Sequence, residues 1–260
     1  MGVLASRLVF PTPEVSYEKD PHLIWLVTEH RDVIPAFYID HGSKHTLLFS
    51  HGNAEDLGNV VDRTTRMSHQ LNVNVFAYEY TGYGLSTGEA SEQSTYRDIE
   101  TAFSYLRFVI GVPEDEIILY GWSLGSGPSV HLASTFDVGG LVLHSAFASI
   151  LRVVLPTRNG VLGDIFPNLE TIGKVKCPVL IVHGVQDDIT PIWHARELVA
   201  ACRKGCAYTP YFVEGAGHDD VETVAGDEYM KHLEGFLHWL EKGAPSNAVD
   251  IFEGQPVHQV

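Results

Sequence analysis

The sequence predicts an α/β fold with a mostly parallel central sheet of about eight strands flanked by helices, and three observations support it. Apolar, β-branched runs alternate with longer segments of helical periodicity, which is the pattern of a parallel sheet. Several runs, such as Val179–Val182, are unbroken, as expected of strands covered on both faces. The 260 residues contain no internal repeat or linker. We therefore expect one domain over residues 1–243 and a tail over residues 244–260.

The strands are predicted from apolar stretches bounded by turn-forming residues. The first two should pair antiparallel, because only a short turn around residues 30–32 separates them. The predicted strands are His22–Glu29, Val33–Ile39, Thr46–Ser50, Val73–Tyr80, Ile117–Trp122, Gly140–His144, Val179–His183 and Tyr208–Val213.

The helices are predicted from apolar residues that recur every three to four positions. One small-residue helix is expected over Gly125–Ser134, directly after a strand. For the helix that follows Val179–His183, Thr190 is the expected N-cap and Pro191 the first helical residue. The remaining helices are expected from Leu57 to Leu71, from Tyr96 to Ile110, and from Tyr229 to near Gly243.

Residues 146–174, between two predicted strands, differ in composition from the rest of the chain. Apolar side chains there are interrupted by several glycines and prolines. A simple crossover from strand to strand would fill this length, and so would a small mobile cap over a functional site. The sequence leaves both interpretations open.

Charge and cysteine content exclude some classes of protein. Lys and Arg total 17 against 33 Asp and Glu, a net charge of -16, which disfavours binding to nucleic acid or to an anionic membrane surface. Residues 1–10 do not form a secretory signal, and no apolar run is long enough to span a bilayer. Three sparse cysteines, Cys177, Cys202 and Cys206, fit a reducing cytosol and form no zinc-binding pattern. A cytoplasmic protein without a metal is expected.

The strongest local motif is Gly121-Trp122-Ser123-Leu124-Gly125, a G-x-S-x-G. It follows an apolar strand and opens a small-residue helix, which is the setting of a nucleophile elbow. The turn places the serine in a strained backbone conformation, and its neighbours must be small to avoid clashes. Ser123 is therefore the candidate nucleophile.

An alcohol needs an adjacent base to attack a carbonyl at neutral pH. Among 14 histidines, His218 lies in a glycine-rich loop after the last predicted strand, at the sheet edge where the serine should also lie. His183 and His51 also follow strands, but each precedes a glycine in another role. His218 is the candidate base; the alternative is a loop histidine that caps the next helix.

The base in turn needs a carboxylate that orients it. Asp187 and Asp188 follow another apolar strand, and the chain order Ser, Asp, His is the one used by the α/β-hydrolase fold. Asp187 is the candidate, with Asp188 as a solvated neighbour or a helix cap.

Acyl transfer also needs N–H groups directed at the developing oxyanion. The backbone N–H of Leu124, the residue after the serine, is one candidate. The second is the N–H of Asn53, in the loop after Thr46–Ser50. The alternative is that His51 and Gly52 simply make a tight turn there.

Five ordered motifs together resemble one family. They are His51-Gly-Asn-Ala-Glu-Asp-Leu-Gly58, Tyr78-Glu-Tyr-Thr-Gly-Tyr-Gly84, Gly121-Trp-Ser-Leu-Gly-Ser-Gly127, His183-Gly-Val-Gln-Asp187 and Val213-Glu-Gly-Ala-Gly-His218. From about Leu8 to Leu240 the chain resembles the α/β-hydrolase domain-containing 17 family of depalmitoylase-like serine hydrolases. The resemblance implies hydrolysis of acyl thioesters, with S-palmitoylated proteins as substrates and no cofactor. It matches Ser123, Asp187 and His218 to the family triad, and Leu124 and Asn53 to the oxyanion positions.

The chain departs from that family near its start. Family members carry an N-terminal cysteine cluster that is palmitoylated, whereas this chain has no cysteine before Cys177. Residues 1–6 instead fit the M-G-x-x-x-[ST] pattern for N-myristoylation of Gly2. One myristoyl chain binds a membrane only marginally. Peripheral membrane contact through Gly2 is thus a hypothesis added to the cytoplasmic location.

The leading functional hypothesis is an esterase or thioesterase that acts on a fatty-acyl group, including the acyl group of S-acylated proteins. Phe147, Leu151 and Leu155 are expected to line an acyl groove. Two alternatives remain open: a serine peptidase of the aminopeptidase or prolyl-peptidase type, and a non-catalytic binding protein on a hydrolase scaffold.

Overall fold

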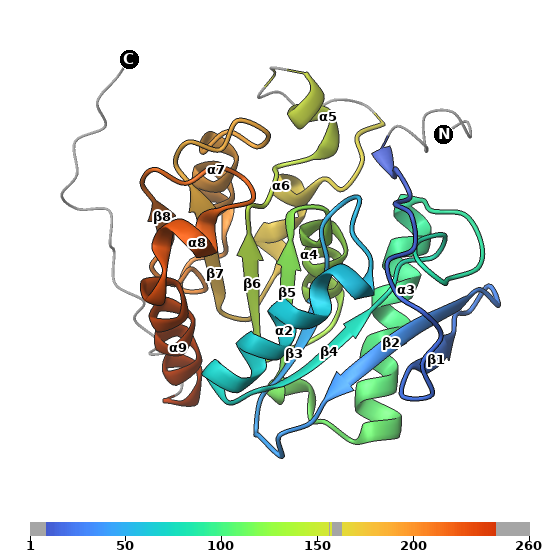
Figure 1. Cartoon of the computed structure of the whole chain (residues 1–260). Helices are drawn as coiled ribbons and strands as arrows, with labels where there is room; N and C mark the ends of the chain where they lie inside the picture. Colours follow the sequence, from blue (N-terminus) through green and yellow to red (C-terminus); the bar gives the residue numbers. More distant parts are fainter. Residues whose placement is uncertain (1–8, 156, 158–162, 243–260) are drawn as a thin grey trace, which may run out of the picture.

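An eight-stranded, mostly parallel sheet forms the centre of the computed structural model, which describes residues 9–155, 157 and 163–242 (Figure 1). The strand order is β1-β2-β4-β3-β5-β6-β7-β8. The strands are β1 (Ile24–Val27), β2 (Val33–Ile39), β3 (Thr46–Ser50), β4 (Asn74–Tyr78), β5 (Ile117–Trp122), β6 (Gly140–His144), β7 (Val179–Gly184) and β8 (Tyr211–Val213).

The pairing of the strands confirms the predicted α/β fold class. β2 pairs antiparallel with both β1 and β4, and the remaining neighbours are parallel. β2, β3, β5 and β6 have the predicted bounds. β8 is shorter than predicted, because Pro210 has no N–H to continue the ladder. Upstream of Pro210, Ala207 makes only an isolated bridge to Val179.

Helices cover both faces of the sheet (Figure 1). One apolar core lies under α2, α8 and α9, and the other lies under α3, α4 and α7. The helices are α2 (Leu57–Leu71), α3 (Glu92–Tyr105), α4 (Ser126–Thr135), α5 (Ile150–Val154), α6 (Asn168–Thr171), α7 (Trp193–Ala201), α8 (Val221–Ala225) and α9 (Asp227–Glu241). A π-helical turn, η1 (Leu106–Ile110), extends α3, and three 3-10 turns are η2 (Glu114–Glu116), η3 (Ser123–Gly125) and η4 (Ile172–Lys174). None of the helices in the described part of the chain is long and apolar enough to cross a membrane.

Capping side chains define where α2 and α3 begin. Asp56 caps α2 reciprocally with Asn59, and Ser91 caps α3 reciprocally with Ser94. The Ser91 cap explains why α3 starts before Tyr96, where the apolar period begins.

The predicted start of the helix after β7 is wrong. α7 begins at Trp193, so Thr190 is not its N-cap and Pro191 is not its first residue. The reason is that Thr190 is engaged elsewhere: its N–H and its hydroxyl both donate to the carboxylate of Asp187.

The segment between β6 and β7 contains the short helices α5 and α6, and α5 lies beyond the carboxyl ends of β5 and β6 (Figure 1). Residues 156 and 158–162 of the expected 146–174 cap are outside the described residues. So are Gly2 of the predicted myristoylation site and the tail over residues 244–260. The three cysteines form no disulfide.

The turn from β5 into α4 depends on two glycines. A Cβ on Gly125 would collide with the backbone carbonyl oxygen of Ser50 at the end of β3, and a Cβ on Gly121 would collide with Gly125 and Ser129. Between them Ser123 has a φ of 48°, in the left-handed region that L residues rarely adopt. The close approach of β3 therefore holds the strained serine in place.

Gly125→Ala should destabilise the protein by about 2–3 kcal/mol, the cost of an overpacked site that cannot relax. Its φ of -60° suits alanine, so the loss would come from the steric collision alone. Urea unfolding measures the difference. Gly173→Ala is the control, since its Cβ would meet only Ala201 O at an ordinary 3.4 Å. Equal stability of the two variants would contradict this account of the turn.

Candidate active site

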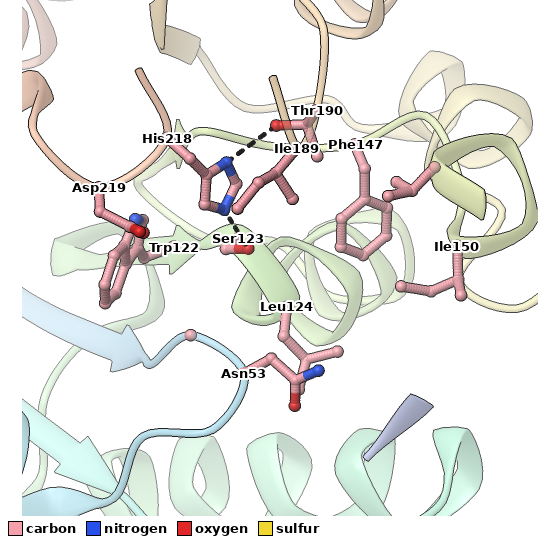
Figure 2. Close-up of a pocket in the computed structure, with 12 residues that line it drawn as sticks. Asn53, Trp122, Ser123, Leu124, Phe147, Ile150, Ile189, Thr190, His218 and Asp219 are labelled. Atoms are coloured by element: carbon pink, nitrogen blue, oxygen red, sulfur yellow. Dashed lines mark hydrogen bonds between the residues drawn. The ribbon is translucent and has the colours of Figure 1, made fainter. Parts of the chain in front are cut away.

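Ser123 lies at the carboxyl end of β5, where the elbow exposes its hydroxyl to a pocket (Figure 2). Its Oγ is 2.8 Å from Nε2 of His218, which comes from the loop between β8 and α8. Ser145 Oγ donates to the backbone carbonyl of His218, and Asp220 accepts from the N–H of Gly217. These bonds fix the loop, so the imidazole is held over the serine.

Asp187 continues this chain of hydrogen bonds. Its Oδ2 lies 2.8 Å from Nδ1 of His218, and its side chain is fully buried. Because a carboxylate only accepts, the ring proton of His218 must sit on Nδ1, which leaves Nε2 free to accept from Ser123. The structure thus brings together the three residues of the predicted triad. Asp188, the alternative acid, is exposed to solvent.

The Asp187 carboxylate is held by more donors than the sequence suggests. Its Oδ1 accepts from the N–H groups of Ile189 and Thr190, and its Oδ2 accepts from the Thr190 hydroxyl. His183 Nε2, fully buried, lies 3.2 Å from Oδ2. Burial opposes ionisation, but the hydrogen bonds from His183 and His218, the charge of His218 and the Thr190 N–H together hold the pKa of Asp187 well below its usual range.

Sequence reasoning missed Thr190 and His183 as parts of the site. The spacing Asp187-x-x-Thr190 was a usable signal, since a carboxylate often accepts from groups two and three residues ahead. Thr190 Oγ1 is also 3.1 Å from Nδ1 of His218 (Figure 2), so one threonine touches both the acid and the base.

The pocket in front of Ser123 has a volume of about 280 Å³ and a mostly apolar wall. Phe147 lines it as predicted, but Leu151 and Leu155 do not. Ile150 and Val153 of α5 line it instead, because residues three apart share one face of a helix. The other lining residues are Gly52, Asn53, Trp122, Ser123, Leu124, Ile189, Thr190, His218 and Asp219.

Both predicted oxyanion residues, Leu124 and Asn53, line this same pocket. The side-chain amide of Asn53 points away from Ser123 (Figure 2): it donates to Val9 O and accepts from the hydroxyl of Tyr83. Any contribution of Asn53 at the serine must therefore come from its backbone N–H.

Within residues 9–155, 157 and 163–242, no cluster of three histidine, cysteine or acidic side chains is arranged to hold a metal ion. What the described site offers is a hydroxyl, an imidazole and a carboxylate in one hydrogen-bonded line. That arrangement can transfer the hydroxyl proton and form a bond from oxygen to an electrophilic carbon.

Sequence comparison relates the chain to curated proteins of known family. It is 44% identical over 197 residues to α/β hydrolase domain-containing protein 17C of Xenopus laevis, which covers 75% of this chain and 62% of that protein. It is 40% identical over 196 residues to human protein 17B, covering 75% of this chain and 67% of that protein. The chain belongs to the α/β-hydrolase domain-containing 17 family. The predicted resemblance is confirmed.

These matches cover only part of the related sequence or of this chain. The match to the first of these relatives spans less than two thirds of that protein's length. Residues 36–133 also match a family model described as "Chlamydia CHLPS protein (DUF818)". That span ends within α4, so it includes the elbow and the loop after β3 but neither Asp187 nor His218.

Solved structures show the same fold. An esterase of Pyrococcus furiosus superposes with a TM-score of 0.72 at 16% identity, covering 88% of this chain and 99% of the esterase. Mouse α/β hydrolase domain-containing protein 10 superposes with a TM-score of 0.65 at 17% identity, covering 84% and 99%. At these identities the likeness establishes the α/β-hydrolase fold.

Asp187→Asn should lower the turnover of a p-nitrophenyl ester by about 10³–10⁴-fold, because an amide no longer fixes the required tautomer of His218. Asp188→Asn is the matched control and should stay within about twofold of the wild type. A large loss in the Asp188 variant, with little in the Asp187 variant, would reverse the assignment.

The stability of the protein should depend on pH through Asp187. A carboxyl group whose pKa is lower in the folded state stabilises the fold above its unfolded pKa of about 3.9, and this contribution is lost as the pH falls below that value. The stability difference between wild type and Asp187→Asn should thus shrink between about pH 5 and pH 3. Urea unfolding at several pH values measures it. A difference that stays constant over this range would refute the linkage.

Proposed function

We propose that this protein is a serine hydrolase that cleaves acyl esters or thioesters, with Ser123 as nucleophile, His218 as general base and Asp187 as the orienting acid. The observation that carries the proposal is the line of hydrogen bonds from Ser123 through His218 to Asp187, 2.8 Å at each step, beside an apolar pocket.

In the proposed reaction, Ser123 Oγ attacks the acyl carbonyl carbon while its proton passes to Nε2 of His218. The negative charge on the carbonyl oxygen would be met by the N–H groups of Leu124 and Asn53. His218 then gives the proton to the leaving alcohol or thiol, and an acyl-enzyme remains on Ser123. Water, activated by the same histidine, releases the acid.

The pocket supports a fatty-acyl group as the substrate moiety. Phe147, Ile150 and Val153 form an apolar wall next to the serine, and Ile189, which also lines the pocket, is 49% exposed. An alkyl chain laid along such side chains leaves water and is stabilised by about 25 cal/mol per Å² of buried apolar surface.

Within this class we propose S-palmitoylated proteins as substrates, as the family resemblance implies. A cytoplasmic location, with peripheral membrane contact through a myristoylated Gly2, would bring the enzyme to such substrates. The net charge of -16 disfavours electrostatic adhesion to anionic lipid, so the acyl anchor would have to supply the contact.

Labelling by a fluorophosphonate probe tests the nucleophile. The wild type should react and Ser123→Ala should not, since the probe forms a bond only with an activated serine. Ser129→Ala, a buried serine of α4, is the control and should react like the wild type. A wild type that stays unlabelled would instead favour a non-catalytic binding protein.

A chain-length series tests the substrate class. Rates on p-nitrophenyl and thioester acyl substrates should exceed those on aminoacyl amides, and Phe147→Ala should raise KM most for the longer acyl chains. Preference for aminoacyl amides would instead indicate a peptidase.

A further inference from the structure

His51, the first residue after β3, is fully buried and has a hydrogen-bond acceptor at each ring nitrogen. Its Nε2 lies 2.9 Å from Oε1 of Glu79, and its Nδ1 lies 2.9 Å from the carbonyl oxygen of Gly52. A peptide carbonyl can only accept, so Nδ1 must carry a proton. Whether Nε2 is protonated as well depends on the state of Glu79.

Glu79, also fully buried, is surrounded by donors. Its Oε2 accepts from the N–H of Leu57 and from the hydroxyl of Tyr17. The Tyr17 oxygen itself accepts from the N–H of Leu85, so the single tyrosine proton is directed at Glu79. Oε1 accepts from the N–H of Tyr80. Three donors besides His51 therefore point at its two oxygens, and a group that only accepts satisfies all of them.

The hydrogen bonds are all satisfied when His51 is an imidazolium and Glu79 is a carboxylate. With Glu79 ionised, both of its oxygens accept and both nitrogens of His51 donate. Burial opposes the charge on His51, but the facing Glu79 carboxylate, its hydrogen bond and the Gly52 carbonyl together raise the pKa of His51. Other titratable groups around the ring include Glu55, whose charge also favours the charged form of His51, and Tyr80 and Tyr83, whose rings lie near it.

The carbonyl that His51 contacts belongs to the peptide group that also carries the N–H of Asn53. In a planar trans peptide the C=O and the N–H point in opposite directions, so fixing one fixes the other. The described chain contains no cis peptide. A cationic donor on the carbonyl also polarises the peptide, which makes its N–H a stronger donor.

We propose that His51 and Glu79 are positioning residues of the oxyanion hole: His51, held as an imidazolium by the Glu79 carboxylate, aims and polarises the Asn53 N–H by binding the Gly52 carbonyl. The proposal rests on the proposed serine-hydrolase function. The neighbouring N–H, that of Gly52, is already bound to Oε2 of Glu55, and the hydroxyl of Tyr80 donates to the His51 carbonyl. Contacts on both sides therefore hold this loop.

The protonation of His51 is tested directly by NMR of full-length protein labelled with ¹⁵N-histidine, with the His51 signals assigned from a His51→Gln spectrum. Both ring nitrogens should show imidazolium shifts and attached protons from pH 6 to pH 9. In Glu79→Gln, one ring proton should be lost within that range. A neutral His51 in the wild type at pH 7 would overturn the proposal, whatever the activity.

Its role in turnover is tested with the same Glu79→Gln variant on a p-nitrophenyl ester. Turnover should fall roughly 10- to 100-fold with KM within about twofold, less than the 10²–10³ lost when an oxyanion donor is removed outright. Asp98→Asn is the control, because Asp98 is likewise a buried carboxyl group that accepts an N–H and a side-chain donor, but those donors belong to Thr81 and not to His51.

Equal turnover in a folded Glu79→Gln and in the control would overturn the positioning role, and so would a loss confined to KM. If Glu79→Gln does not fold, His51→Gln is used for the kinetic measurements instead. The same result is expected, a fall in turnover with KM nearly unchanged. A wild type that neither hydrolyses esters nor reacts with fluorophosphonate would overturn the proposed function, and the oxyanion role with it. The NMR arm would still decide the charge of His51.

Discussion

The close approach of the β5–α4 turn to the end of β3 is the constraint on which the site depends. Gly125 lies against the backbone of Ser50, at a distance that admits no Cβ, and the strained φ of Ser123 is maintained by that contact. Because β3 and β5 are adjacent parallel strands, the same contact places the loop after β3 next to the serine. The candidate nucleophile and the candidate oxyanion loop are thus both positioned by the packing of two strand ends against each other.

The candidate acid and the candidate base come from the other half of the sheet. Asp187 follows β7 and His218 follows β8, and these strands pair in parallel, so their carboxyl ends meet at the same edge. A Cβ on Gly184, the last residue of β7, would collide with the backbone of Ala216 and Gly217. Here too a glycine lets two loops approach, which brings the carboxylate within reach of the imidazole.

Sequence patterns within short segments predicted most of the fold. They also predicted Ser123, His218 and Asp187, the three residues that form the line of hydrogen bonds. Strands such as β3 and β5 are unbroken apolar runs with clear turn residues at each end, and the elbow motif lies wholly within five residues. The failures had longer-range causes. The start of α7 was misplaced because Thr190 bonds to Asp187 rather than to its own helix, and the pattern for an N-cap does not by itself decide between these two partners. The pocket-facing residues of α5 were misassigned because four of the five residues of this helix are apolar, so hydrophobicity does not distinguish its inner face from its outer face.

The contacts of Glu79 and His51 were beyond sequence reasoning for a related reason. Glu79 accepts from residues as far apart as Tyr17 and Leu57, so its role exists only after the sheet has formed. Glu79 and His51 are 28 positions apart in the sequence. Neither composition nor hydrophobic periodicity indicates that two such residues form a pair.

The short loop after β7 has a consequence for how selectivity can change. Ile189 lines the pocket and is half exposed, while its own N–H is bound to the Asp187 carboxylate. In the proposed reaction, the fit of the substrate and the orientation of His218 by Asp187 therefore depend on one stretch of backbone. A change at Ile189 that shifts its backbone would therefore also reach the Asp187 carboxylate, whereas Val153, which lines the same pocket from α5, has its N–H bonded to Ser149 O instead. For the proposed hydrolase, α5 is accordingly the side of the pocket where ligand preference could change without a change next to Asp187.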